Sequence, residues 1–385
     1  MAGFNEEEKK EEKKDKKKKT TRTPRTRKSV VTYEELNESD STGYTFQFGG
    51  LPMTGKTINA LALGFINKKN IPILKKEGFK YIVYALENRF IPDIKEIIIV
   101  ESENAIKKQF SRALERDTLR GEGGIPKVIR VHIPVSSKMI DIMDEKAKLT
   151  KESATDIQES QKIYMDAIDD LAGYWDPEYH EWVKGRATEN TLVIIDSASR
   201  LKLLLDVKAG IVTDLRLAAS KDKDGDIDIE VSKKINSEKW IGRNNNWQRC
   251  MTQLRGLPGL VVATFMDQEV TEWVLDMNKK KADKGRAKLM NPITRVQAPR
   301  TAFNFDMCYT FNRNPLDDTV NVSVDDSQGR YIYRGPNSSK YNTWDLDYDN
   351  RYTFLSCIEG MLRIQLYKRL KDTPVDLDEE DKNEE

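Results

Sequence analysis

Several kinds of residue and segment are scarce in this sequence of 385 residues, and each scarcity excludes a class of protein. The three cysteines, Cys250, Cys308 and Cys357, are far apart and form no CxxC pair, so neither a disulfide framework nor a thiolate zinc site is supported. Only His132 and His180 are available for a histidine metal site or a Ser-His-Asp triad. No run approaches the ~20 apolar residues that cross a bilayer, and no apolar signal segment follows the first residue. We therefore expect an intracellular, cytoplasmic protein.

A net charge of one sign is also lacking, since 64 Lys and Arg face 63 Asp and Glu, for a formal charge of +1. The near-zero total results from two end segments whose net charges are opposite in sign. Residues 1–30 hold 12 basic and 6 acidic side chains, whereas 372–385 hold 8 acidic and one basic. Such segments cannot bury enough apolar area to offset their ordering entropy, so we predict disordered tails at 1–32 and 372–385 around a core at 33–371. The basic tail is either a solubility tail or an arm that touches nucleic acid.

Within the core, short apolar runs alternate with helical patterns. The runs are β-branched or aromatic and bounded by turn residues, which is typical of buried parallel strands: Tyr44–Gly49, Tyr81–Leu86, Val128–Val135, Leu192–Asp196, Leu260–Phe265 and Met307–Phe311. Helical spacing is found at Lys56–Asn67, Ser102–Arg116, about Lys138–Tyr174, and Asn246–Gly256. This alternation predicts an α/β fold with a mostly parallel central sheet flanked by helices.

The pattern changes near the C-terminal end and in two long intervals between strands. Thr319–Val324 and Tyr331–Arg334 are predicted to form a β-hairpin. Residues 136–190 and 203–240 are predicted to be helical insertions that decorate the core. His132 lies inside an apolar run, which favours a buried core histidine, and the tryptophans of the insertions and their borders are expected to anchor these segments to the core: Trp175, Trp182, Trp240 and Trp247.

The strongest motif is a phosphate-binding loop. From Gly50 the sequence reads Gly50, Leu51, Pro52, Met53, Thr54, Gly55, Lys56 and Thr57, which satisfies the G-x-x-x-x-G-K-[ST] pattern in full. The motif follows an apolar strand and opens a helix, as the chemistry requires. The glycines let backbone N–H groups wrap phosphates, the lysine ammonium meets the β and γ oxygens, and the Thr57 hydroxyl is a ligand for Mg²⁺. Pro52 has no N–H to donate, so we expect it at the outer bend.

Two carboxylates are candidates to complete this site. Thr191–Ser197 is an apolar strand that ends in Asp196, which we predict to orient the metal as the Walker B acid. Tyr81–Leu86 is predicted to be the strand after the P-loop helix, and it would deliver Glu87 to the sheet edge that holds the phosphates. Glu87 is therefore the predicted group that positions or deprotonates the attacking water.

With these motifs in hand, the chain resembles the RecA-like P-loop ATPases, in which a strand of the type Leu192–Ser197 holds the metal-orienting acid. Within that group it looks most like the compact ATPases of phages and archaeal viruses that are linked to single-strand annealing and recombination. Three further stretches carry this resemblance: Trp240–Trp247 leading through Leu254–Gly259 into a strand, Val296–Arg300 followed by Phe305–Tyr309, and the segment ending Tyr331–Pro336. The likeness covers roughly Tyr44–Tyr341, and the long insertions depart from it.

The resemblance implies further roles. Thr264 would be the polar sensor of the γ-phosphate, and Arg334 or Lys340 would reach the nucleotide of a neighbouring subunit. The implied cofactors are ATP and Mg²⁺, and the implied partners are DNA, single-stranded by analogy, and further copies of the chain, in the host cytoplasm if the protein is viral. Three functions stay open: a DNA-dependent ATPase of recombination or replication, a packaging or translocation motor, and a nucleotide-gated DNA-binding or assembly protein.

Overall fold

The computed structural model describes residues 43–102, 106–115, 126–143, 147–221, 229–269, 272–274, 288–290, 293–297, 301–313, 319–324, 343–346 and 353–371. All of them belong to one compact unit, Ser39–Glu385. The two predicted tails and the segment Tyr331–Arg334 lie outside the described residues, so the predicted disorder and the predicted hairpin stay predictions. Among the described helices, none is both long and apolar enough to cross a membrane.

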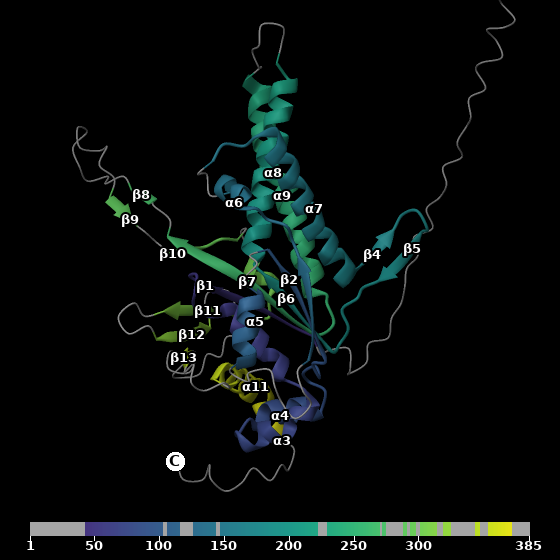
Figure 1. Cartoon of the computed structure of the whole chain (residues 1–385), viewed down its shortest axis with the longest axis vertical. Coiled ribbons are helices and arrows are strands. Elements are labelled where there is room, and N and C mark those ends of the chain that lie inside the picture. The colour runs from purple at the N-terminus through teal and green to yellow at the C-terminus, as the bar shows by residue number, and fades with distance from the viewer. Residues whose placement is uncertain are drawn as a thin grey trace, which may run out of the picture. The chain divides into compact units, whose positions relative to one another are not determined.

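One large sheet organises the described chain (Figure 1). Its strands run in the order β13 (Thr343–Leu346), β12 (Val320–Val324), β11 (Met307–Arg313), β1 (Tyr44–Gly50), β7 (Leu260–Glu269), β6 (Thr191–Asp196), β2 (Glu96–Glu101) and β3 (Lys127–His132). Neighbours from β11 to β3 are parallel, whereas β12 and β13 are antiparallel. A short strand, β10 (Ile293–Arg295), pairs antiparallel with the end of β7. The predicted mostly parallel α/β sheet is confirmed.

Helices bury both faces of this sheet. On β2, Ile97 and Ile99 belong to one buried cluster, while Ile98 and Val100 belong to another, which is the alternation of a strand with two covered faces. The first cluster includes side chains of α2 (Lys56–Ala62), α3 (Ile71–Lys76), α4 (Lys80–Glu87), α5 (Ile106–Glu115) and α11 (Thr353–Lys371). The second includes side chains of α6 (Ser137–Met143), α7 (Lys151–Ala172), α8 (Ala198–Ala219) and α9 (Ile229–Arg255). Single 3-10 turns lie at η3 (Leu63–Phe65), η4 (Lys68–Asn70) and η5 (Thr301–Asn304).

The prediction of a strand at Tyr81–Leu86 is wrong, because these residues form most of helix α4. The buried side chains of α4, Ile82, Val83, Ala85 and Leu86, recur at helical spacing. The start of the helix is fixed from a distant part of the chain: Glu359 of α11 accepts hydrogen bonds from the backbone N–H groups of Tyr81 (2.7 Å) and Ile82 (2.8 Å). A carboxylate at a helix N-terminus satisfies otherwise unpaired N–H groups and complements the helix dipole.

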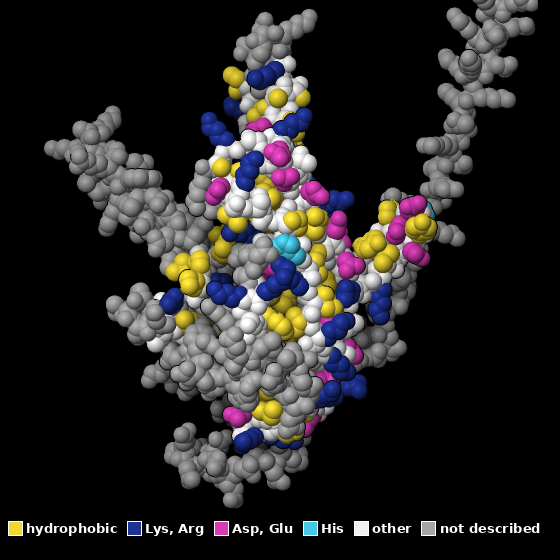
Figure 2. Space-filling model, in the orientation of Figure 1, with side chains coloured by type: hydrophobic (Ala, Val, Ile, Leu, Met, Phe, Trp, Pro, Cys, Tyr) yellow, Lys and Arg dark blue, Asp and Glu magenta, His cyan; other side chains and the backbone are white. Residues whose placement is uncertain are grey.

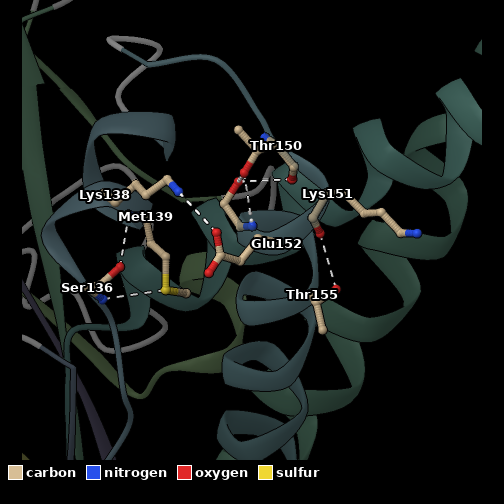
Figure 3. A network of polar contacts seen from close by, with 8 residues as sticks. Ser136, Lys138, Met139, Thr150, Lys151, Glu152 and Thr155 are labelled. Atoms are coloured by element: carbon tan, nitrogen blue, oxygen red, sulfur yellow. Dashed lines mark hydrogen bonds and ion pairs between the residues drawn. The ribbon is translucent and has the colours of Figure 1, made fainter.

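Helices α7, α8 and α9 pack side by side and occupy much of the two predicted insertions (Figure 1). Helix α7 begins with a capping box, in which the Thr150 hydroxyl accepts from the Ser153 N–H (3.2 Å) and the Ser153 hydroxyl accepts from the Thr150 N–H (2.9 Å). Figure 3 shows how this start is tied to α6, where Lys138 forms an ion pair with Glu152 at 3.7 Å. These contacts fix the start of α7 relative to α6.

Two short ribbons extend from the core: β4 (Gly173–Asp176) with β5 (Glu181–Lys184), and β8 (Glu272–Val274) with β9 (Lys288–Met290). Figure 2 shows hydrophobic side chains gathered on the first ribbon. The expectation that all four tryptophans are core residues is only partly right. Trp247 is fully buried and donates to the Thr301 hydroxyl at 2.8 Å, whereas Trp175, Trp182 and Trp240 are exposed.

Candidate functional site

The predicted phosphate loop joins the end of β1 to the start of α2. Gly50 has a φ of 151°, and a Cβ at this position would lie 2.5 Å from the backbone oxygen of Phe311 on the neighbouring strand. Gly55 has a φ of 82° and is the N-cap residue of α2. Both conformations favour glycine, so the two invariable positions of the motif are explained by the backbone alone.

The interior of the loop is organised around Lys56. Its ammonium donates to the carbonyl oxygens of Gly50 (2.8 Å) and Leu51 (2.7 Å), and the buried Thr54 hydroxyl also donates to the Leu51 oxygen (2.9 Å). Pro52 is exposed at the bend, as expected for a residue without an N–H. The loop therefore encloses a lysine ammonium that is ready to exchange neutral carbonyl acceptors for charged phosphate oxygens.

Asp196 connects the loop to the sheet. The hydroxyl of Thr57, the second residue of α2, donates to Asp196 Oδ2 at 2.9 Å. The hydroxyl of Thr264 on β7 donates to the other oxygen, Oδ1, at 2.6 Å. Asp196 is buried and Thr264 is fully buried, so the carboxylate is held by two hydroxyls in a protected position. The structure thus brings together three of the predicted site residues, which are separated by as many as 207 positions in the sequence.

Glu87 is not part of this group. It is the last residue of α4, its side chain is 47% exposed, and it forms an ion pair with Lys75 of α3 at 3.2 Å. The sheet-edge position predicted for Glu87 depended on a strand at Tyr81–Leu86, and that strand is absent from the described residues. Because this segment is a helix, Glu87 lies beside α3 and does not follow a strand of the sheet.

The strand that follows the P-loop helix is β2, and it ends in a different carboxylate, Glu101. Glu101 is the register partner of Asp196 on β6, and it is 1% exposed. Ile97 and Ile99 share the sheet face of Leu192 and Ile194, so Glu101 and Asp196 lie on that same face, which α2 covers. Sequence reasoning missed this residue although the signal was present: four apolar residues, Ile97 to Val100, precede the carboxylate just as they precede Asp196.

Glu101 has basic neighbours on β3. Arg130 Nε donates a hydrogen bond to Glu101 Oε1, and Arg130 Nη2 is in ion-pair contact with the same oxygen. His132 Nδ1 lies 3.5 Å from Oε1 and 3.1 Å from Arg130 Nη2. The side chain of His132 is 37% exposed, so the prediction of a buried core histidine is wrong.

Arg334 and Lys340, the predicted trans-acting candidates, lie outside the described residues.

These observations decide the fold class. A glycine-rich loop leads from a central parallel strand into a covering helix, and the strand that holds the carboxylate partner of Thr57 is separated from the loop strand by β7. The fold is RecA-like.

No family model matches the chain, and no curated protein sequence matches it. Among solved structures, the crystal structure of the RadB recombinase is similar, with 13% sequence identity, coverage of 76% of this chain and 83% of that chain, and a TM-score of 0.29. The assignment rests on the sheet and the loop rather than on that likeness.

Proposed function

We propose that the chain binds MgATP at the Gly50–Thr57 loop and hydrolyses it. The observation that carries the proposal is that the buried Asp196 carboxylate accepts hydrogen bonds from both Thr57 and Thr264, which connects α2, at the end of the loop, to strands β6 and β7. In an enzyme of this class, catalysis is mostly positioning and electrostatic stabilisation, and those tasks need fixed hydroxyls and charges of this kind.

The donor set fits a hard divalent cation with phosphate. The Thr57 hydroxyl and the Asp196 carboxylate are oxygen ligands 2.9 Å apart, and oxygen ligands are those that Mg²⁺ prefers. Thr57 would bind the cation directly, Asp196 would orient it, and Lys56 with the loop N–H groups would bind the phosphates. When bound, the cation supplies charge neutralisation at the phosphate oxygens.

We assign the activation of water to Glu101 instead of Glu87. Glu101 follows the strand next to the Asp196 strand and lies on the face that carries α2. A carboxylate at this position can accept the proton that the attacking water loses, which is general-base catalysis. Thr264 would hold Asp196 in place through its hydrogen bond and, by the resemblance, would sense the γ-phosphate.

We further propose that the ATPase acts on DNA. The segment 275–288, between β8 and β9, holds six basic residues (Lys279, Lys280, Lys281, Lys284, Arg286 and Lys288) and two acidic ones, a net charge of +4. In the sequence this segment follows β7, the strand that carries Thr264, and precedes β10, which pairs with the end of β7. Lysine-rich segments bind nucleic acid by neutralising phosphates.

Four further proposals rest on the sequence resemblance. They are a role in viral recombination or replication, single-stranded DNA as the substrate, a homo-oligomer, and Arg334 acting in trans.

The test is an ATPase assay of the full chain with single-stranded DNA, duplex DNA or neither. We expect stimulation by DNA, stronger for single strands, and loss of both ATP binding and turnover in Lys56→Ala. Exposed Lys75→Ala, in the ion pair with Glu87, is the matched control that keeps wild-type turnover. Undiminished hydrolysis by Lys56→Ala would refute the site. Tight ATP binding without any DNA stimulation would instead favour a nucleotide-gated assembly protein.

A further inference from the structure

The ion pair between Arg130 and Glu101 is largely buried, and both contacts of the guanidinium are with a single carboxylate oxygen. Glu101 is 1% exposed, and the Arg130 side chain is 26% exposed, so the ion pair is largely removed from water. Two donors of the guanidinium, Nε and Nη2, are directed at the same carboxylate oxygen, Oε1. A buried charge-assisted contact of this kind is hard to break, because separating the partners leaves a buried charge unpaired.

The register of the strands places this pair next to Asp196, a residue of the proposed ATP site. Asp196, Glu101 and His132 end three adjacent strands, Thr264 lies beside Asp196 within the next strand, β7, and Arg130 lies two residues before His132 on the same face of β3. Arg130 therefore approaches Glu101 from the side opposite to Asp196. Because Nε and Nη2 of Arg130 both contact Oε1, the pair fixes the orientation of the Glu101 carboxylate toward β3.

We propose that Arg130 is a positioning residue that restrains Glu101, so that hydrolysis requires the Arg130–Glu101 pair to open. This proposal rests on the assignment of water activation to Glu101. In it, the loop, Lys56, Thr57 and Asp196 bind nucleotide whether the pair is closed or open, and only turnover depends on its opening. The restraint separates binding of ATP from its hydrolysis within a single subunit.

The surroundings of the pair allow it to open without repacking the core. His132, which contacts both partners, also lines a cavity of about 510 Å³ whose other walls include Ser136, Met139 and Ser160. Figure 3 shows that Ser136 and Met139 are tied to each other at the start of α6, so this wall is held in place. The cavity lies beside His132, and the Arg130 side chain is itself 26% exposed, so it can move away from Glu101 toward solvent.

The experiment compares steady-state ATP turnover and ATP affinity in three Arg130 variants of the full chain. In Arg130→Ala we expect kcat to rise by about 10-fold, a barrier change of about 1.4 kcal/mol, with unchanged ATP affinity. Arg130→Lys keeps the cation and is expected to remain near wild type. Arg130→Met fills the same space without charge and reproduces the rise if Arg130→Ala proves unstable. A kcat that is unchanged or lower in both apolar variants, with ATP binding intact, overturns the proposal.

A matched control exists on the same two strands. Lys127 and Glu96 are register partners at the opposite end of β3 and β2 and form an ion pair at 2.8 Å, so Lys127→Ala removes a similar cross-strand pair far from the loop. We expect no change in kcat. Glu101→Gln in the wild-type background tests the underlying assignment separately: it should abolish turnover, alone and combined with Arg130→Ala. Normal turnover in Glu101→Gln refutes that assignment and the restraint with it, whereas inactive Glu101→Gln with an unaltered Arg130→Ala refutes the restraint alone.

Discussion

Replacing Thr264 by valine removes one hydrogen bond from the centre of the site and keeps the shape of the side chain. Thr264 is fully buried, and its hydroxyl donates to Asp196 Oδ1 at 2.6 Å. A hydrogen bond to a charged group contributes about 1.5–3 kcal/mol to stability, and the loss leaves one carboxylate oxygen buried with a donor fewer. Since valine fills the same volume, no cavity term is added, and we expect Thr264→Val to lower the free energy of unfolding by about 2 kcal/mol. Turnover should fall as well, because Asp196 loses one of the two hydroxyls that orient it.

The assay is urea denaturation followed by circular dichroism, in a double-mutant cycle with Asp196→Asn. Thr264→Ser is the control that keeps the hydroxyl and loses one methyl group, at a cost of about 1 kcal/mol. If the two residues act through their hydrogen bond, the cycle gives a coupling energy of at least about 1 kcal/mol. A coupling near zero, with Thr264→Val as stable as the wild type, would refute the reasoning that Thr264 supports the carboxylate.

Three further predictions concern the scaffold. Gly50→Ala should lower stability by about 3 kcal/mol and abolish ATP binding, because its Cβ meets a backbone oxygen at 2.5 Å; a stable, ATP-binding variant contradicts this. Glu359→Ala should cost about 2 kcal/mol in urea denaturation, since two backbone N–H groups of α4 lose their acceptor, whereas wild-type stability would argue against that cap. Burial raises the pKa of Cys250 from 9.0 to about 12, so its thiol should resist labelling at pH 8 until the chain is unfolded. The unfolded thiol ionises first as the pH rises above 9, so this residue should make the folded state less stable between pH 9 and 12, and pH-independent stability there would contradict it.

The strand–loop–helix arrangement at Gly50–Thr57 and the position of Asp196 at a strand end could be predicted from sequence because both depend on local signals. The loop needs glycine at two strained backbone positions and a lysine and a threonine in fixed order, and these requirements are written in consecutive residues. Asp196 follows an uninterrupted apolar strand, and parallel strands bring such ends to one edge. Thr264 was indicated only by the resemblance to RecA-like ATPases, and its hydrogen bond to Asp196 could be known only from the structure.

The carboxylate that lies beside Asp196 could not be located from the sequence, because two neighbouring segments have similar apolar patterns. Both Tyr81–Leu86 and Ile97–Val100 are rich in apolar and β-branched residues, and the first becomes a helix through tertiary contacts that include the Glu359 cap. Secondary-structure propensity is weak enough for such contacts to override it. The Arg130–Glu101 ion pair could not be predicted from the sequence either, because it depends on which strand lies beside β2.

The most direct test of the account is a single-turnover measurement of ATP hydrolysis by Glu101→Gln and Glu87→Gln, with ATP binding measured on the same samples. We predict that Glu101→Gln binds ATP normally and hydrolyses it at least about 100-fold more slowly, the usual contribution of a general base. Glu87→Gln should hydrolyse ATP at the wild-type rate, because it changes only a half-exposed ion pair between α3 and α4. Normal hydrolysis by Glu101→Gln, together with loss of hydrolysis in Glu87→Gln, would contradict the account.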